Sequence, residues 1–128
     1  DISMSKESKT ILLVEDDKAL NHAVTFKLKQ EGHRVISTER AEDALQALKD
    51  NPQIDIIWLD FLLPGMNGIE FLKELRKQPE FKDKKVVICS VSGRSDDKDL
   101  WRALGAVDYL VKSDYDISEL VNKVISYA

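Results

Sequence analysis

The sequence has little of what marks several large classes of protein. Cys89 is its only cysteine, which excludes an internal disulfide and leaves too few thiols for a zinc site. It lies in an apolar run at residues 86–89, so we expect a buried, unreactive thiol. No apolar run approaches the roughly 20 residues that span a bilayer, and no basic segment followed by an apolar one opens the chain. We therefore expect a cytoplasmic protein.

Positive charge is also scarce relative to negative charge, and the net charge is −4. This balance disfavours direct binding to nucleic acid and to an anionic membrane surface. What the sequence does have is the composition of an ordinary globular domain, with 43% apolar and 33% charged residues over 128 positions. Residues 1–8 show no periodicity, so we expect a disordered lead or a cloning scar there, and one domain over residues 9–128.

Alternating patterns of strand and helix fill this domain. Five short apolar runs, each closed by polar or turn-forming residues, predict buried strands at residues 10–14, 34–37, 54–60, 86–90 and 108–111. Apolar residues at helical spacing predict one amphipathic helix after each strand.

Asp17 is the expected N-cap of the first helix and Gly32 is its expected end. Asp96 or Asp97 is predicted to start the fourth helix, and the fifth begins near Asp116.

This alternation predicts an α/β fold with a parallel sheet and helices on both faces. The reason is that each crossover between parallel strands is right-handed and covers one face of the sheet. For five strands in a doubly wound, flavodoxin-like fold, the expected strand order is 2-1-3-4-5. This order places the first and third strands side by side, where the winding reverses, and ligands bind at the carboxyl ends of strands in such sheets.

Three carboxylates are predicted to meet at that edge. The apolar run at residues 54–60 ends on Asp60, and Glu15 and Asp16 directly follow the first strand. Neighbouring carboxylates repel one another and raise one another's pKa, so we expect either a bound divalent cation or one protonated carboxyl group. Oxygen ligands without His or Cys favour Mg²⁺, or alternatively Mn²⁺, over zinc.

Two further polar side chains are predicted at the ends of the later strands. Ser90 ends the fourth strand and Lys112 follows the fifth. A carboxylate nucleophile, a metal, a lysine and a hydroxyl suit phosphoryl transfer to the carboxylate, because such catalysis is mostly positioning and charge neutralisation. The predicted product is an aspartyl phosphate on Asp60.

These motifs in this order closely resemble the receiver domain of bacterial two-component response regulators. The resemblance spans residues 9–127, and the separations of 30 residues from Asp60 to Ser90 and 22 from Ser90 to Lys112 are those of the family. Its motifs are Glu15-Asp16, Asp60 followed by residues 63–68, Ser90, and residues 108–112.

The resemblance implies a module of a phosphorelay. Asp60 would accept a phosphoryl group from a histidine kinase or histidine phosphotransfer protein, and Ser90 and Lys112 would bind the phosphoryl oxygens. The implied Mg²⁺ ligands, some of them acting through water, are Glu15, Asp16, Asp60 and the backbone carbonyl of Leu62. The module would catalyse its own phosphorylation without being a turnover enzyme.

The resemblance also implies a conformational switch. Tyr109 would move inward when Ser90 shifts toward the phosphate. That movement would remodel the face formed by the fourth helix, fifth strand and fifth helix, a two-state element biased by a local charge. An output domain or a partner protein would bind this face.

Three positions depart from the pattern of the family. Val91 stands where the family usually has Ala or Gly, and its branched side chain would narrow access to Asp60. Ser113 stands where the family usually has a proline with a cis bond. A cis bond before serine would cost about 3 kcal/mol, so we expect a trans bond or a strained loop. Leu62 would position an attacking water poorly, so we expect slow self-dephosphorylation.

Other functions are weighed against this one. A phosphatase that uses an aspartyl phosphate commonly needs a second Asp two residues after the nucleophile, and Leu62 occupies that position. A nucleotide-binding enzyme is disfavoured because no glycine-rich loop follows the first strand. A degenerate receiver that acts only in protein–protein contact remains as the alternative.

No chemical role is assigned to the remaining candidate side chains. Trp58 and Trp101 are expected to pack in the interior, and a tyrosine such as Tyr109 on a strand is often packing as well. His22 and His33 are expected in solvent.

Overall fold

The computed structural model describes residues 7–91 and 95–128. The lead expected over residues 1–8 lies outside the described residues except for Glu7 and Ser8, so its disorder stays a prediction. The Ser8 hydroxyl donates to the carbonyl of Gly32 at 2.9 Å, which places it against the turn before the second strand. The side chains of Asp96 and Asp97 also lie outside the described residues.

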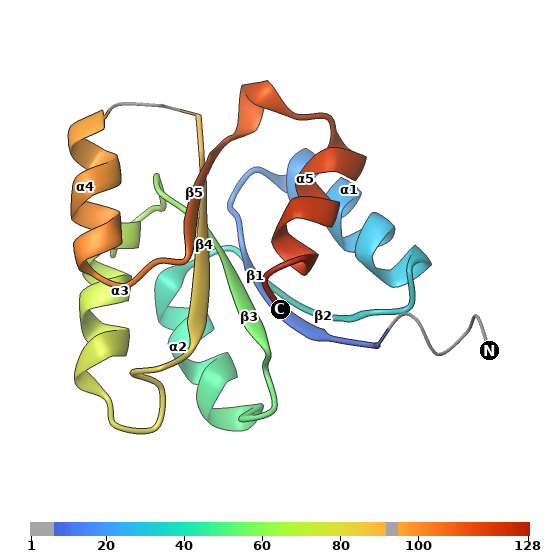
Figure 1. The fold of residues 1–128 in the computed structure, drawn as a ribbon. Helices are drawn as coiled ribbons and strands as arrows, with labels where there is room; N and C mark the ends of the chain where they lie inside the picture. The colour runs from blue at the N-terminus through green and yellow to red at the C-terminus, as the bar shows by residue number, and fades with distance from the viewer. Residues whose placement is uncertain (1–6, 92–94) are drawn as a thin grey trace.

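Within residues 7–91 and 95–128, five parallel strands form one sheet in the order β2-β1-β3-β4-β5 (Figure 1). The strands are β1 (Thr10–Val14), β2 (Arg34–Thr38), β3 (Ile56–Asp60), β4 (Lys85–Ser90) and β5 (Asp108–Val111). The predicted fold class and strand order are confirmed, and two of the five predicted strands have the bounds found in the structure. Asp55 lies just before β3 because its carboxylate and its N–H bond the backbone of Thr10, each at 2.8 Å.

In the described part of the chain, five α-helices cover the two faces of the sheet. They are α1 (Lys18–Gln30), α2 (Ala41–Asp50), α3 (Gly68–Lys77), α4 (Ser95–Ala103) and α5 (Ile117–Ile125). Figure 1 shows α2, α3 and α4 on one side of the sheet and α1 and α5 on the other. Within the described residues, no helix combines the length and the apolar character that crossing a bilayer requires.

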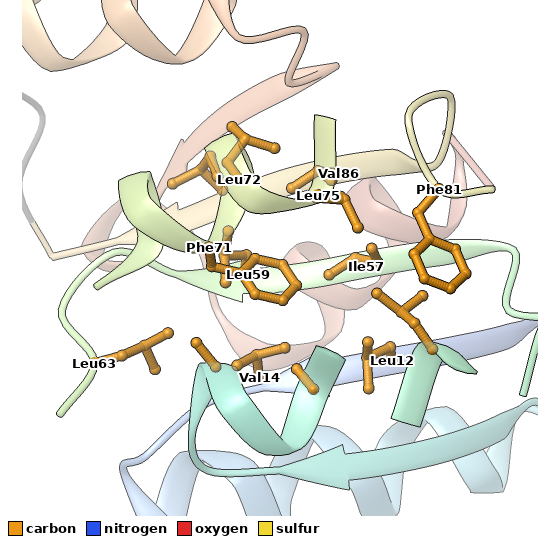
Figure 2. Close-up of a cluster of buried hydrophobic side chains, with 14 of the residues drawn as sticks. Leu12, Val14, Ile57, Leu59, Leu63, Phe71, Leu72, Leu75, Phe81 and Val86 are labelled. Carbon is orange, nitrogen blue, oxygen red and sulfur yellow. The ribbon is translucent and has the colours of Figure 1, made fainter. Parts of the chain in front are cut away.

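Alternate residues of each central strand face opposite layers of helices. In β1, Leu12 and Val14 join the cluster under α2, α3 and α4, whereas Ile11 and Leu13 join the cluster under α1 and α5. Figure 2 shows the first cluster, where Leu12 and Val14 lie with side chains of β3 and α3. Because both faces are covered, the middle residues of the central strands are apolar on both sides, which is why their sequences show unbroken runs rather than alternation.

Side-chain caps fix where several helices begin. The Asp17 carboxylate accepts the N–H of Leu20 at 3.1 Å, so its predicted role as the N-cap of α1 is confirmed. Asn67 and Asp116 each form a capping box with the glutamate three residues later, at the starts of α3 and α5. Gly32 adopts φ +91° just after α1, the left-handed conformation expected of a residue that ends a helix.

The prediction for one of the two histidines is wrong. His22 is exposed as expected, but His33 is only 8% exposed, and its Nδ1 accepts the backbone N–H of Lys9 at 3.1 Å. The chain turns at Gly32 and enters β2 beside the residues that precede β1. The imidazole of His33 is buried between the start of β2 and those residues. Trp58 and Trp101 are buried, at 0% and 1% exposure, as predicted.

Candidate functional site

The acids of the first and third strands meet at the carboxyl edge of the sheet. Val14 pairs with Leu59, so the residues that follow β1 lie beside Asp60, the last residue of β3. One carboxylate oxygen from each of Glu15, Asp16 and Asp60 lies within 4.8 Å of the other two. Glu15 is 1% exposed and Asp60 is 5% exposed, whereas Asp16 is exposed to solvent. The cluster therefore has a buried floor and one acid at its mouth.

Lys112 reaches into this cluster from the far side of β4. It follows β5 and begins the short 3₁₀ helix η2 (Lys112–Asp114). Its Nζ lies 2.6 Å from Glu15 Oε1 and 3.3 Å from Asp60 Oδ1. Among the described residues, one ammonium group faces three carboxylates, so the cluster keeps an excess of negative charge. A divalent cation with a preference for oxygen ligands would balance this excess.

Burial and crowding change the acidity of these groups. Burial, and then the nearby charge of Glu15, raise the pKa of the Asp60 carboxyl from 3.8 to about 7, against the opposing effect of Lys112. For Lys112, burial alone would lower the pKa, but the hydrogen bond with Glu15 and the charge of Asp60 outweigh it, so the pKa is raised. Near neutral pH the ammonium is charged, and without a cation the raised pKa lets Asp60 hold a proton more readily than an exposed aspartate does.

Three further residues lie near the same strand ends. They are Ser90 and the two apolar residues that depart from the family pattern, Leu62 and Val91. Asp60 pairs with Cys89 on β4, which places Ser90, a fully buried residue, one step beyond the level of Asp60. Leu62 and Val91 are 61% and 66% exposed, so both project largely into solvent next to the cluster.

Two expectations about the surroundings have a clear outcome. All peptide bonds in the described part of the chain are trans, so the bond between Lys112 and Ser113 takes the first of the two expected forms. Cys89 is fully buried as predicted, and burial raises the pKa of its thiol. A thiol with a raised pKa carries little thiolate, which agrees with an unreactive residue.

Aromatic side chains connect the residue after Asp60 with the proposed switch tyrosine. The ring of Phe61 meets the indole of Trp101 on α4 edge-on, with centroids 5.4 Å apart. The indole in turn lies 6.3 Å from the ring of Tyr109, which is half-buried on β5, and Lys98 Nζ lies 5.8 Å from the centre of that ring. Tyr109 therefore contacts Trp101 of α4, and the same indole contacts Phe61, the residue next to Asp60.

Sequence reasoning missed one residue close to the site. Asn21, in the first turns of α1, is 8% exposed, and its amide donates to the carbonyl of Glu15 at 2.9 Å. The available signal was its helical spacing, because it shares a face with the buried Val24 and Leu28. A polar residue on an apolar face needs hydrogen-bond partners in the interior.

Comparisons with known proteins agree with this architecture. The family model described as response regulator receiver domain matches residues 11–125. The chain is 33% identical over 117 residues to the phosphate regulon transcriptional regulatory protein PhoB of Escherichia coli, which covers 91% of this chain and 50% of PhoB. The chain thus spans about half the length of the curated relatives it matches.

Two solved structures are similar over nearly their whole length. The Mn(2+)-bound form of response regulator Rcp1 is 32% identical with a TM-score of 0.78, covering 92% of this chain and 90% of that one. The phosphorylated cyanobacterial phytochrome response regulator RcpA is 30% identical with a TM-score of 0.80, covering 94% and 91%. Together with the family match, these similarities show that the chain belongs to the response regulator receiver domain family.

Proposed function

We propose that the chain is a phosphorylation-dependent signalling module that accepts a phosphoryl group on Asp60. The donor is the phosphohistidine of a histidine kinase or of a histidine phosphotransfer protein. The observation that carries the proposal is the buried Asp60 carboxylate, which lies beside two acids and 3.3 Å from the ammonium of Lys112. The phosphorylated structure of the similar RcpA supports this chemistry.

The residues at the cluster fit a divalent cation, most simply Mg²⁺. All three side chains offer carboxylate oxygens, and one lysine leaves part of their charge unbalanced. Glu15, Asp16 and Asp60 would hold the ion together with the carbonyl of Leu62, and a bound cation supplies positive charge for the phosphoryl oxygens. The Mn(2+)-bound form of Rcp1 supports a site for an ion of this class.

The side chains around Asp60 have separate roles in the transfer. The ionised carboxylate attacks phosphorus, an O–P bond forms, and the P–N bond to the donor imidazole breaks with its electron pair left on nitrogen. Lys112 lies close enough to Asp60 to neutralise a phosphoryl oxygen, and the Ser90 hydroxyl would donate to another. The protein takes up one phosphoryl group per chain, so it is a phosphoacceptor rather than a turnover enzyme.

The signal would leave the site through Ser90 and Tyr109. A shift of the Ser90 hydroxyl toward the phosphoryl group would let Tyr109 move inward and change its contacts with Trp101 and Lys98. Because Trp101 lies on α4, the movement would alter the face formed by α4, β5 and α5. An output domain or a partner protein would read this face.

Intact-mass spectrometry with Mg²⁺ and a small phosphodonor such as acetyl phosphate tests the proposal. We expect one phosphoryl adduct on the wild type and none on Asp60→Asn. The matched control is Asp55→Asn, which changes a carboxylate bonded to Thr10 outside the cluster and should keep the adduct.

Two other outcomes would refute the proposal. Rapid release of inorganic phosphate without an accumulated adduct would indicate a phosphatase. Absence of any adduct in the folded wild type would indicate the degenerate receiver, which is not favoured because the acids and the lysine of the site are all present and close together.

A further inference from the structure

The segment that carries Glu15 and Asp16 is short and needs something to hold it. Only residues 15–17 connect β1 to α1, and the two acids must reach Asp60 and Lys112 from this turn. The backbone N–H of Asp17 donates to Glu15 Oε2 at 3.0 Å, and Lys112 engages Oε1 at 2.6 Å. These contacts orient the Glu15 side chain, but they do not fix its backbone.

The side chain of Asn21 holds the backbone of Glu15 in place. Its Nδ2 donates to the carbonyl of Glu15 at 2.9 Å and to the carbonyl of Thr38 at 3.3 Å. The Thr38 carbonyl also accepts the N–H of Glu15 at 3.0 Å. Both peptide groups of Glu15 are therefore bonded, the N–H to the end of β2 and the carbonyl to the side chain of Asn21.

The other end of the Asn21 amide is bonded as well. Its Oδ1 accepts the hydroxyl of Ser37 at 2.6 Å and the hydroxyl of Thr25 at 3.4 Å. Carbonyl oxygens only accept, so the nitrogen of the amide must face Glu15 and Thr38, and its orientation is determined. With two donated and two accepted bonds, the buried amide uses its full bonding capacity and is held rigidly.

We propose that Asn21 is a positioning residue of the cation site, which sets the spacing of Glu15 and Asp16 relative to Asp60. This inference rests on the cation binding in the proposed function and extends it to selectivity. Mg²⁺ requires near-ideal octahedral geometry at short distances, whereas Ca²⁺ accepts longer and more variable ones. A site held rigidly by Asn21 therefore favours Mg²⁺, and a loosened site loses Mg²⁺ affinity more than Ca²⁺ affinity.

The test is to measure the Kd of Mg²⁺ and of Ca²⁺ by calorimetry for the wild type and for Asn21→Ala. Partners that orient metal ligands typically change metal affinity by 10- to 100-fold, so we expect the Mg²⁺ Kd to rise by about 10-fold in Asn21→Ala. The Ca²⁺ Kd should rise less, so that the preference for Mg²⁺ falls. Circular dichroism and urea unfolding establish that each variant is folded.

Asn51→Ala is the matched control. The Asn51 amide donates to the carbonyl of Ala47 at 2.9 Å, at the end of α2. This variant also loses a bond from an amide to a backbone carbonyl, so it should be destabilised while the affinities for both ions stay unchanged. A readout that merely followed stability would move in both variants.

The metal affinities of the variants decide whether Asn21 positions the cation site. Unchanged affinities in folded Asn21→Ala, or equal losses for both ions, would overturn it. If Asn21→Ala does not fold, Ser37→Ala decides, because it removes one bond to Asn21 without touching Glu15. A smaller fall in the preference for Mg²⁺ supports the inference, and no change overturns it. A wild type that binds neither ion would instead refute the cation site of the proposed function, and the inference with it.

Discussion

Replacing Asp60 by asparagine should make the cation-free protein more stable at alkaline pH. In the folded state the pKa of this carboxyl is raised from 3.8 to about 7. The folded protein therefore holds a proton that the unfolded chain has already lost, and the free energy of unfolding falls as the pH rises from about 4 to about 7. At about 1.4 kcal/mol per pH unit, the difference sets an upper limit of about 4 kcal/mol.

The structure supports a gain below that limit. Asp60 is only 5% exposed, so solvent screens little of the repulsion, but the variant also gives up the contact between Asp60 and Lys112 at 3.3 Å. The Lys112 ammonium keeps its bond to Glu15, so no buried charge is left unpaired. We expect Asp60→Asn to gain about 1–3 kcal/mol at pH 8 and much less at pH 5.

Urea unfolding at pH 5 and pH 8, in EDTA and in Mg²⁺, measures this gain. Saturating Mg²⁺ should stabilise the wild type more than Asp60→Asn and reduce the difference between them. Asp55→Asn should show no gain that grows with pH, because Asp55 bonds the backbone of Thr10 outside the cluster. A variant at Asp60 that is less stable than the wild type at pH 8 in EDTA, or a gain independent of pH, would refute this account of the site.

Three further predictions follow from the same geometry. Lys112→Met should lower the free energy of unfolding in EDTA by about 2–4 kcal/mol, because Glu15 and Asp60 lose their cation. Mg²⁺ should restore part of that loss in urea titrations. Gly68→Ala should destabilise by about 1–3 kcal/mol in the same assay despite the better helix propensity of alanine, because its Cβ would lie 2.9 Å from the Asp60 carbonyl oxygen. The phosphoryl group should persist in purified protein, since Leu62 offers no polar atom to an attacking water, and Leu62→Asn should shorten its lifetime. A wild-type half-life of seconds by intact mass would contradict this last expectation.

The parts of the fold that could be predicted from the sequence are those set by burial on both faces. The bounds of β1 and β5 were predictable because polar residues stop each run abruptly. The start of β3 was not, since Ile54 and Asp55 continue the run, and only the bonds of Asp55 to Thr10 show that the strand begins later. The convergence of the acids followed from strand order alone, because acids at the ends of adjacent strands have to be neighbours.

The errors and omissions concern side chains whose surroundings come from distant segments. His33 reads as a surface residue in sequence, and its burial depends on how the chain before β1 passes beside it. The helical spacing of Asn21 indicates a buried face of α1, but it does not reveal the hydrogen-bond partners of the side chain. Its four bonds come from the ends of β1 and β2 and from Thr25, and only the assembled sheet brings those groups together.

The destabilising acids and the phosphoryl chemistry have the same physical origin. Burial of Asp60 limits the waters that could reach an aspartyl phosphate there, and the same burial raises the pKa of its carboxyl. Lys112 limits this rise in the resting protein by pairing with Glu15 and Asp60, and in the proposed function the same ammonium would bind a phosphoryl oxygen. The acids at this edge destabilise the folded state. Burial of the two apolar layers that enclose β1 and β3 offsets that destabilisation. The apolar residues of β1 and β3 therefore continue up to the residue where the charged site begins.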